Sequence, residues 1–127
     1  MIEKFKTKYL DEIMQIWLTS NISAHSFIPV SYWNNMFDEV KKMIPKSEIY
    51  VYRDNGEILG FIGLTDYYIN GIFVSRRSSG IGKSLIDYVK NLKDRLELNV
   101  YEKNKLAIKF YERESFKINS KSTDKST

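Results

Sequence analysis

The stretch VSRRSSGIGKSL, Val74–Leu85, joins an apolar run to an amphipathic one. Gly80 and Gly82 are separated by one residue and lie among hydroxyl and basic side chains. Glycines at such positions allow backbone N–H groups to approach a ligand closely. The unpaired donors and the dipole at the start of a helix favour an anion such as a pyrophosphate. The stretch therefore predicts a strand, a phosphate-binding turn and a helix, and the alternative is a tight turn that binds nothing.

Two common phosphate-binding motifs do not fit this stretch. A dinucleotide-binding fold needs a third glycine in GxGxxG, and the chain has only two glycines here. A P-loop needs GxxxxGK[ST]; Gly82, Lys83 and Ser84 match its end, but Arg77 occupies the position of its first glycine. The pattern that remains is [RQ]xxGx[GA], which runs from Arg77 to Gly82.

Apolar spacing and turn residues predict the elements on both sides of this stretch. Asn55-Gly56 predicts a tight hairpin, Asn104 is expected to cap a helix, and residues 21–30 are expected to form a loop. Strands are predicted at 1–6, 47–54, 57–66, 68–74, 95–101 and 115–120, and helices at 9–20, 33–44, 81–92 and 104–114. The order β-α-α-β-β-β-α-β-α-β predicts one α/β (α+β) domain over 1–127, with residues 118–127 as a frayed tail. Its sheet is expected to be mixed, mostly antiparallel and flanked by helices.

Composition excludes several classes of site. The chain has no cysteine and a single histidine, His25, which argues against disulfides, thiolate or histidine metal sites and a Ser/His/Asp triad. No metal is expected. A charged N-terminal segment and the lack of a long apolar run predict a cytoplasmic protein without a membrane partner. The net charge of +4 is spread along the chain, so nucleic acid is an unlikely partner, which salt-dependent binding would test.

A second motif follows the glycine turn at a fixed distance. Asn104, Ala107, Phe110, Tyr111 and Phe116 form the pattern NxxAxxFYxxxxF. Together with the preceding Phe73-Val74 and the RxxGxG turn, this resembles the GNAT superfamily of N-acetyltransferases. The resemblance implies a GNAT fold and transfer of an acetyl group from acetyl-CoA to a primary amine of a small molecule or peptide. The alternative is a weak or inactive GNAT-like module that binds acyl-CoA as a sensor.

The resemblance also implies roles for individual residues. Tyr111 matches the family's general acid, which protonates the departing thiolate, and the backbone of the strand before the glycine turn is expected to hold the pantetheine arm. The residues expected to bind acetyl-CoA are Ile72, Phe73, Val74, Arg77, Ser78, Ser79, Gly80, Ile81, Gly82, Lys83, Ser84, Asn104 and Tyr111.

The acceptor side of the site is less specific in the sequence. His25 is a candidate catalytic base and substrate contact, because it lies in the segment that lines the acceptor site in this superfamily. Asp66, Glu102 and ordered water are the other candidate bases. The residues expected to contact the acceptor are His25, Phe27, Asp66 and Tyr67.

Two departures from the family pattern concern the end of the chain. Ser115 precedes Phe116 where glycine is usual, and a residue there often needs a positive φ. The strand predicted at 115–120 has no following strand to cover its edge, so a homodimer or a more open acceptor site is expected.

Overall fold

The structure is a computed structural model that describes residues 1–75 and 80–117. Its five-stranded sheet has the order β1-β2-β3-β4-β5. The strands are β1 Ile2–Lys4, β2 Glu48–Asp54, β3 Glu57–Thr65, β4 Tyr68–Val74 and β5 Glu97–Leu98. The pairs β1–β2, β2–β3 and β3–β4 are antiparallel, and β5 runs parallel to β4, which confirms the expected mixed sheet. Asn55 and Gly56, with φ values of 52° and 79°, form the predicted hairpin between β2 and β3.

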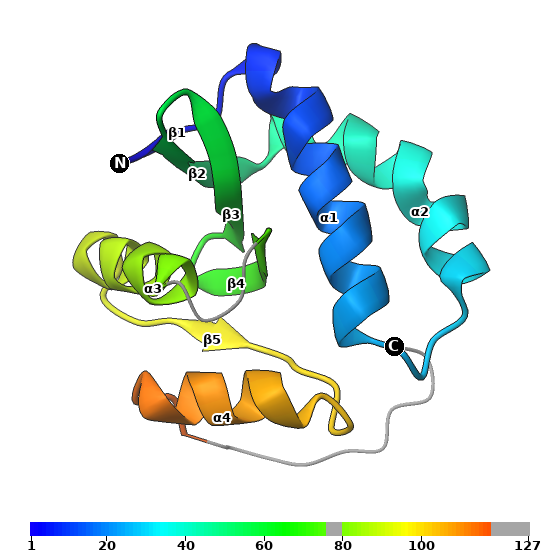
Figure 1. Ribbon diagram of the computed structural model, residues 1–127. Helices are drawn as coiled ribbons and strands as arrows, with labels where there is room; N and C mark the ends of the chain where they lie inside the picture. Colours follow the sequence, from blue (N-terminus) through cyan, green and yellow to red (C-terminus); the bar gives the residue numbers. More distant parts are fainter. Residues whose placement is uncertain (76–79, 118–127) are drawn as a thin grey trace.

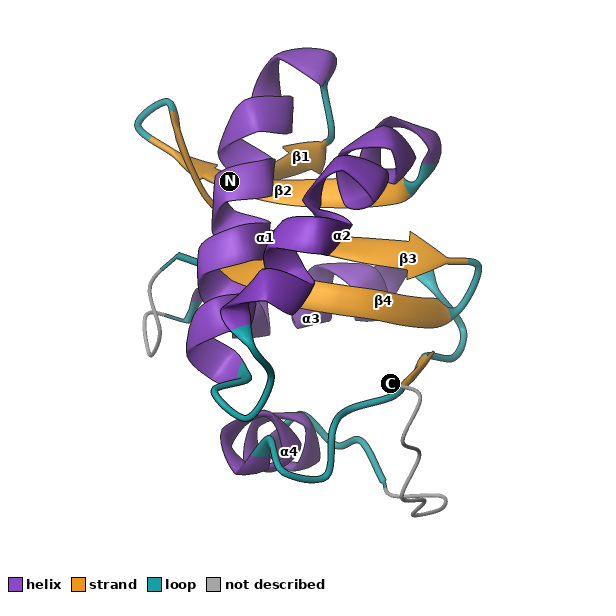
Figure 2. Ribbon diagram, turned by 90° about the vertical axis from the view of Figure 1, so that its right-hand side faces the viewer, coloured by secondary structure: helices purple, strands orange, loops and turns teal. Residues whose placement is uncertain are grey.

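Helices cover both faces of this sheet (Figure 1). The helices α1, Leu10–Ala24, and α2, Val30–Met43, lie on one face, and α3, Ile81–Leu92, lies on the other. Short 3-10 turns, η1 at Thr7–Tyr9 and η2 at Ile44–Lys46, precede α1 and follow α2. The last helix, α4, Lys105–Arg113, lies apart from these layers on the β5 side (Figure 2). Within residues 1–75 and 80–117, no helix has the length and apolar character needed to cross a membrane.

Two apolar clusters fill the space between the layers. The α1/α2 cluster is built around Ile13, Val51 and Phe61 and includes Trp17 and Trp33, whose rings meet edge to face at 5.9 Å. The α3 cluster contains the inward-facing residues of α3, and partly buried side chains of α4 pack against it. The buried residues of α3 are Ile81, Leu85, Ile86 and Val89. This spacing explains the helix, because one apolar stripe recurs every three or four residues.

The strands β4 and β5 are paired over a short length only. Their register joins Tyr68 to Glu97 and Ile69 to Leu98, and the two segments then diverge (Figure 2). Asn70 is the extra residue of a bulge, since Gly63 pairs with Gly71 and Leu64 pairs with Ile69. In the described part of the chain, the last residues of β4 therefore have no strand partner on the β5 side. Their backbone donors and acceptors are available on that side.

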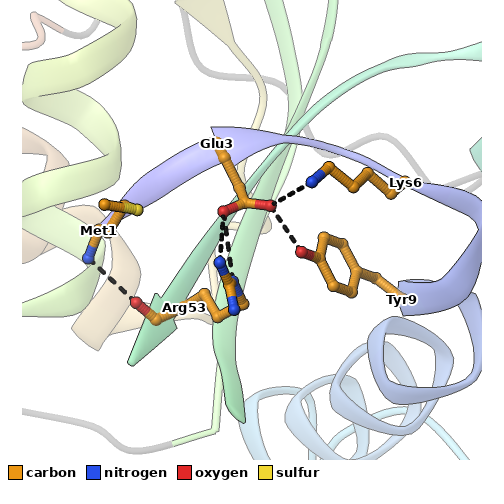
Figure 3. A network of polar contacts seen from close by, with 5 residues as sticks. All are labelled: Met1, Glu3, Lys6, Tyr9 and Arg53. Atoms are coloured by element: carbon orange, nitrogen blue, oxygen red, sulfur yellow. Dashed lines mark hydrogen bonds and ion pairs between the residues drawn. The ribbon is translucent and has the colours of Figure 1, made fainter. Parts of the chain in front are cut away.

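A polar network holds the N-terminal strand to its neighbours (Figure 3). The Glu3 carboxylate accepts hydrogen bonds from the Tyr9 hydroxyl at 2.6 Å and from the Arg53 guanidinium at 3.0 and 3.2 Å. Lys6 lies 3.5 Å from the same carboxylate, and the Met1 ammonium donates to the Arg53 carbonyl oxygen. The hydrogen bond from Tyr9, opposed in part by desolvation and supported by the Arg53 charge, lowers the pKa of Glu3 to about 2. The network thus ties β1 to β2 and to the start of α1.

Several predicted elements differ from the structure. The helix expected at 33–44 begins earlier, at Val30. The helix expected at 9–20 continues to Ala24, so the loop expected at 21–30 begins only at His25. The strand expected at 95–101 is reduced to Glu97–Leu98, because β4 offers a partner over two residues only. Residues 115–117 are a helix C-terminal turn and not the start of a strand, and the rest of the strand expected at 115–120 lies outside the described residues. The edge on which the homodimer expectation depended is therefore not formed by residues 115–117.

The turn that ends α4 explains this last difference. Ser115 has a φ of 75°, as its position in the sequence pattern suggested. The N–H groups of Ser115 and Phe116 donate to the carbonyl oxygens of Glu112 and Tyr111. These two bonds and the contact between the Tyr111 and Phe116 rings form a Schellman motif. Phe116 is used to close the helix instead of to begin a strand.

Candidate active site

The glycine turn opens α3 as the sequence predicted. Gly80 is the N-cap of α3 and has a φ of 80°, a backbone conformation that residues other than glycine rarely adopt. Gly80 supplies no side chain to cap the first turn, so the first backbone N–H groups of α3 have no capping bond from it. Residues 76–79, which include Arg77, Ser78 and Ser79, lie outside the described residues. The described half of the turn fits an anion held by backbone amides.

The side chains at the start of α3 have structural partners. Ile81 is buried in the α3 cluster, and the Ser84 hydroxyl donates to the Gly80 carbonyl oxygen at 3.0 Å. The Lys83 ammonium lies 3.3 Å from the Glu114 carboxylate and 3.5 Å from Asp87. The hydrogen bond that Lys83 donates to the Glu114 carboxylate is the main reason why the pKa of Lys83 is raised. Lys83 therefore links α3 to the end of α4 while its side chain stays largely exposed.

The strand before the turn carries the expected backbone groups. Ile72 and Val74 flank the α3 cluster, whereas the Phe73 ring stacks on Phe61 at 4.9 Å on the other face. The Phe73 ring also lies against Gly71, where any Cβ atom would collide with it. Because the side chains of β4 are packed on both faces, a ligand along its free edge would meet backbone groups.

Tyr111 lies in the second half of α4. Its ring contacts those of Phe110 and Phe116 and packs against the α3 cluster, as Ile72 and Val74 do. Burial raises the pKa of the Tyr111 hydroxyl to about 12. The hydroxyl is therefore protonated at neutral pH and can act as a proton donor.

Asn104 caps α4 as predicted, and it has a second contact. Its Oδ1 accepts from the Ala107 N–H at 3.2 Å, and its Nδ2 lies 3.4 Å from Nε2 of His25. His25 is the C-cap of α1, and its Nδ1 lies 3.2 Å from the Asn21 carbonyl oxygen. Desolvation lowers the pKa of His25 below its usual 6.5. The structure thus joins the end of α1 to the start of α4.

An aromatic group surrounds the His25 ring. Tyr101 and Phe27 meet it edge to face at centroid distances of 4.9 and 5.7 Å, and Trp33 lies at 5.3 Å. Beside this group is a cavity of about 270 Å³ between the end of α1 and the start of α4. The cavity is lined by Ser23, Ala24, Ser26, Phe27, Lys103, Asn104, Lys105 and Leu106.

The structure brings together only some of the residues expected on the acceptor side. His25 and Phe27 lie side by side, with Asn104 close to His25. Asp66 and Tyr67 form the turn between β3 and β4, at the end of β4 far from Gly80. Asp66 has a φ of 54°, and the Tyr67 ring lies 4.0 Å from the Arg95 guanidinium. These two residues have turn and packing contacts there, away from His25.

Two residues of the site were not singled out from the sequence. Asn21 is buried on the apolar face of α1, where Ile13 and Trp17 precede it at four-residue intervals. A polar residue at a position of that stripe is a signal that the sequence carries. Its amide donates to the Trp17 carbonyl oxygen at 2.9 Å. Tyr101 carries no comparable signal, because its contact with His25 depends on how the chain returns from β5.

Comparisons with known proteins agree with this geometry. Residues 45–118 match the family model described as an acetyltransferase (GNAT) domain. The chain is 32% identical over 122 residues to the peptidyl-lysine N-acetyltransferase YiaC of Escherichia coli K12, covering 93% of this chain and 84% of that protein. It is 26% identical over 115 residues to the peptidyl-lysine N-acetyltransferase YjaB of the same organism, covering 88% and 78%.

Solved structures share the fold. The apo-form solution structure of Escherichia coli YjaB superposes with a TM-score of 0.79 at 24% identity, covering 88% of this chain and 78% of that one. The PaiA N-acetyltransferase of Thermoplasma acidophilum, crystallised with coenzyme A, gives 0.84 at 14% identity, covering 97% and 92%. The chain therefore belongs to the GNAT family of acetyltransferases, enzymes that transfer the acetyl group of acetyl-CoA to an amine.

Proposed function

We propose that this enzyme acetylates the side-chain amine of lysine in proteins or peptides. The observation that carries the proposal is the likeness to YiaC, a peptidyl-lysine N-acetyltransferase that matches 93% of the chain. YjaB, which is less similar in sequence, is also a peptidyl-lysine N-acetyltransferase. A lysine side chain is long enough to reach into a site from a protein surface, and its free amine is the nucleophile that the reaction needs.

The chain's own residues suit the binding of acetyl-CoA. Acetyl-CoA supplies a thioester carbonyl that a free amine attacks. The N–H groups from Gly80 to Lys83 would hold the pyrophosphate. Arg77, Ser78 and Ser79, which lie outside the described residues, are proposed as further contacts of the coenzyme. The free edge of β4 at Ile72–Val74 would pair with the pantetheine arm, because no described strand pairs with its backbone groups on that side. Asn104 would contribute its carboxamide near the same arm.

Tyr111 would act as the general acid. As the bond from the carbonyl carbon to sulfur breaks, its hydroxyl hydrogen is available to the departing thiolate. A pKa of about 12 keeps this proton in place at neutral pH until a strong base forms beside it. The incoming lysine reacts as the free base, and the proton that its nitrogen loses as the amide forms passes to solvent, from which Tyr111 regains its own. The rate should therefore rise with pH as the free amine becomes more abundant.

A panel of amine acceptors tests the proposal. Purified protein is given acetyl-CoA with lysine-containing peptides, matched peptides with arginine in place of lysine, polyamines and free amino acids, and the released thiol is measured. We expect thiol release with the lysine peptides and an added acetyl group on the lysine by mass spectrometry. Release with small amines but not with peptides would overturn the peptide assignment, and binding of acetyl-CoA without turnover would favour the sensor alternative.

A further inference from the structure

His25 connects two segments that are 79 residues apart in the chain. Its Nδ1 faces a backbone carbonyl oxygen, which can only accept a hydrogen bond, so Nδ1 must carry the proton. In the neutral ring Nε2 then has a free lone pair, and it faces the Nδ2 amide of Asn104, which can only donate. Both partners thus require the same form of His25, the neutral ring protonated at Nδ1.

The orientation of the Asn104 carboxamide is fixed independently. Its Oδ1 accepts from the Ala107 N–H and caps α4, so its Nδ2 must point away from that N–H and toward His25. If the carboxamide turned over, Oδ1 would meet His25 and Nδ2 would face the Ala107 N–H, and the cap would be lost. The protonation of His25 and the capping of α4 are therefore coupled through one side chain.

This coupling matters because the first turn of α4 is weakly packed, whereas its C-terminal half packs against the α3 cluster. No residue of Lys105–Arg113 is fully buried. Asn104 and Tyr111 are about two helical turns apart, so the contact that fixes the first turn of α4 sets the direction of the helix together with the contacts at its C-terminal end.

We infer that His25 is a positioning residue whose neutral ring holds the Asn104 carboxamide, and with it the start of α4, against the end of α1. The inference rests on the proposed function in one respect, which is that Asn104 faces the coenzyme. His25 then acts through Asn104 and is not the catalytic base, since both of its ring nitrogens are already engaged.

The surroundings of His25 make the contact sensitive to pH. The ring is enclosed by Phe27, Trp33 and Tyr101, and the Lys103 ammonium lies 5.9 Å from the centre of the Phe27 ring. Within the described residues, no carboxylate lies at ion-pair distance from His25 to stabilise an imidazolium. A proton on Nε2 would oppose the Asn104 Nδ2 donor and release the contact.

Nuclear magnetic resonance tests the contact without any assay of activity. Because His25 is the only histidine, its ring nitrogen signals are assigned without ambiguity. We expect the Nδ1-protonated form in the native protein and a titration midpoint below 6.5. Asn104→Ala should shift the Nε2 signal and raise the midpoint, whereas Asn70→Ala, in the β4 bulge, should leave both unchanged. An Nε2-protonated ring, or signals that Asn104→Ala does not move, would overturn the inference.

Kinetics with three variants of His25 separate positioning from catalysis. His25→Gln places an acceptor near the position of Nε2, His25→Asn keeps only a donor toward Asn21, and His25→Phe keeps only the ring. We expect His25→Asn and His25→Phe to raise the KM for acetyl-CoA about tenfold, the value of one hydrogen bond, with a smaller change in kcat. The KM of His25→Gln should stay within about threefold of the native value. The native KM should rise as the pH falls below 6.5, because protonation of His25 releases the contact, and the KM of His25→Gln should not.

The outcomes distinguish failure of the inference from failure of the proposed function. A large loss of kcat in all three variants, His25→Gln included, would identify His25 as the base and overturn the inference. An unchanged KM in folded His25→Phe would overturn it as well. If the native protein acetylates no lysine peptide while the ring signals still respond to Asn104→Ala, the proposed function fails and the positioning contact stands.

Discussion

The two ends of α4 are held in different ways. At its C-terminal end, the nearly buried Glu114 carboxylate pairs with Lys83, and the Glu114 carbonyl oxygen accepts from the Lys90 ammonium at 2.5 Å. The Phe116 ring packs against the α3 cluster and lies 5.8 Å from the same ammonium. At its N-terminal end, one neutral hydrogen bond of 3.4 Å joins Asn104 to His25 beside the cavity. The comparison teaches that α4 is anchored where it carries Tyr111 and adjustable where it meets the end of α1.

The largest expected effect tests the anchored end directly. Tyr111→Phe removes only a hydroxyl, so fold and acetyl-CoA binding should persist while kcat falls about ten- to a thousandfold, the range for a positioned acid. Steady-state thiol release measures this. Tyr52→Phe, which changes another ring beside the α3 cluster, is the control and should retain native turnover. Full activity of Tyr111→Phe would assign the proton donor to water or another residue.

Removing the anchor itself should destabilise the protein more than removing the cap. Glu114→Ala eliminates the pairing with Lys83 and leaves a space at the end of α4. We expect the free energy of unfolding to fall by about 1.5 kcal/mol, a modest value because Lys83 is exposed and its pairing is screened by solvent. Urea denaturation measures the change. If Glu114→Ala lowers the free energy of unfolding by less than Asn104→Ala does, the C-terminal end of α4 is not the more firmly held of the two ends.

The cap variant gives the other half of that comparison. Asn104→Ala removes the acceptor for the Ala107 N–H, and loss of such a cap costs about 1 kcal/mol. Asn104→Ser keeps a capping oxygen but has no amide to donate to His25. We therefore expect Asn104→Ser to recover most of the stability without recovering the KM for acetyl-CoA. If Asn104→Ser recovers both the stability and the native KM for acetyl-CoA, the cap is sufficient and the contact with His25 does not contribute to coenzyme binding.

A stabilising substitution is available at the anchored end. Ser115 has a φ of 75°, which glycine adopts without strain. Ser115→Gly should raise the free energy of unfolding by about 0.5 kcal/mol, because relief of strain exceeds the added flexibility of the unfolded chain. Thermal unfolding by circular dichroism is the measurement. Ser47→Gly, at a position with a φ of −106°, is the control and should not stabilise.

The smallest expected effects are those of pH on stability. They distinguish the contribution of His25, at the N-terminal end of α4, from that of the network around Glu3. The folded pKa of His25 lies below 6.5, so the unfolded chain takes up the proton first, and stability declines as the pH falls below 6.5. The folded pKa of Glu3 is about 2 against an ordinary 4.5, so its contribution is complete above 4.5 and is lost as the pH falls toward 2. Denaturation at successive pH values should show two steps, the first absent in His25→Gln and the second smaller in Glu3→Gln. The second step should not vanish, because the pKa of Glu48 is also lowered: against the opposing effect of desolvation, hydrogen bonds from Tyr50 and Lys93 favour its carboxylate.

The sequence predicted best what depends on neighbouring residues. The Asn55-Gly56 hairpin, the cap at Asn104 and the positive φ of Ser115 are local properties of backbone and side chain, and all three are confirmed. The strand expected at 115–120 was wrong for its described part, because alternation around Phe116 looks the same whether the ring begins a strand or closes a helix. The resemblance to the GNAT superfamily, now confirmed by the family match, did more than any periodicity to define the function.

The arrangement of the site was harder to predict, because it depends on where the chain returns. His25 and Asn104 are separated along the chain by four strands, two α-helices and one 3-10 turn. Asp66 and Tyr67 were grouped with His25 by their residue types, but the direction of β4 carries them to the other end of the strand. Roles of single residues on the acceptor side remain predictions for the experiments above.

The aromatic group around His25 also has an optical consequence. The chain has two tryptophans, and both indoles belong to one cluster, with Trp33 5.3 Å from the imidazole. A protonated imidazole quenches the emission of an indole beside it. The native protein therefore carries its own fluorescent reporter of the state of His25, one that needs neither a label nor a substrate and that responds within the time of a mixing experiment.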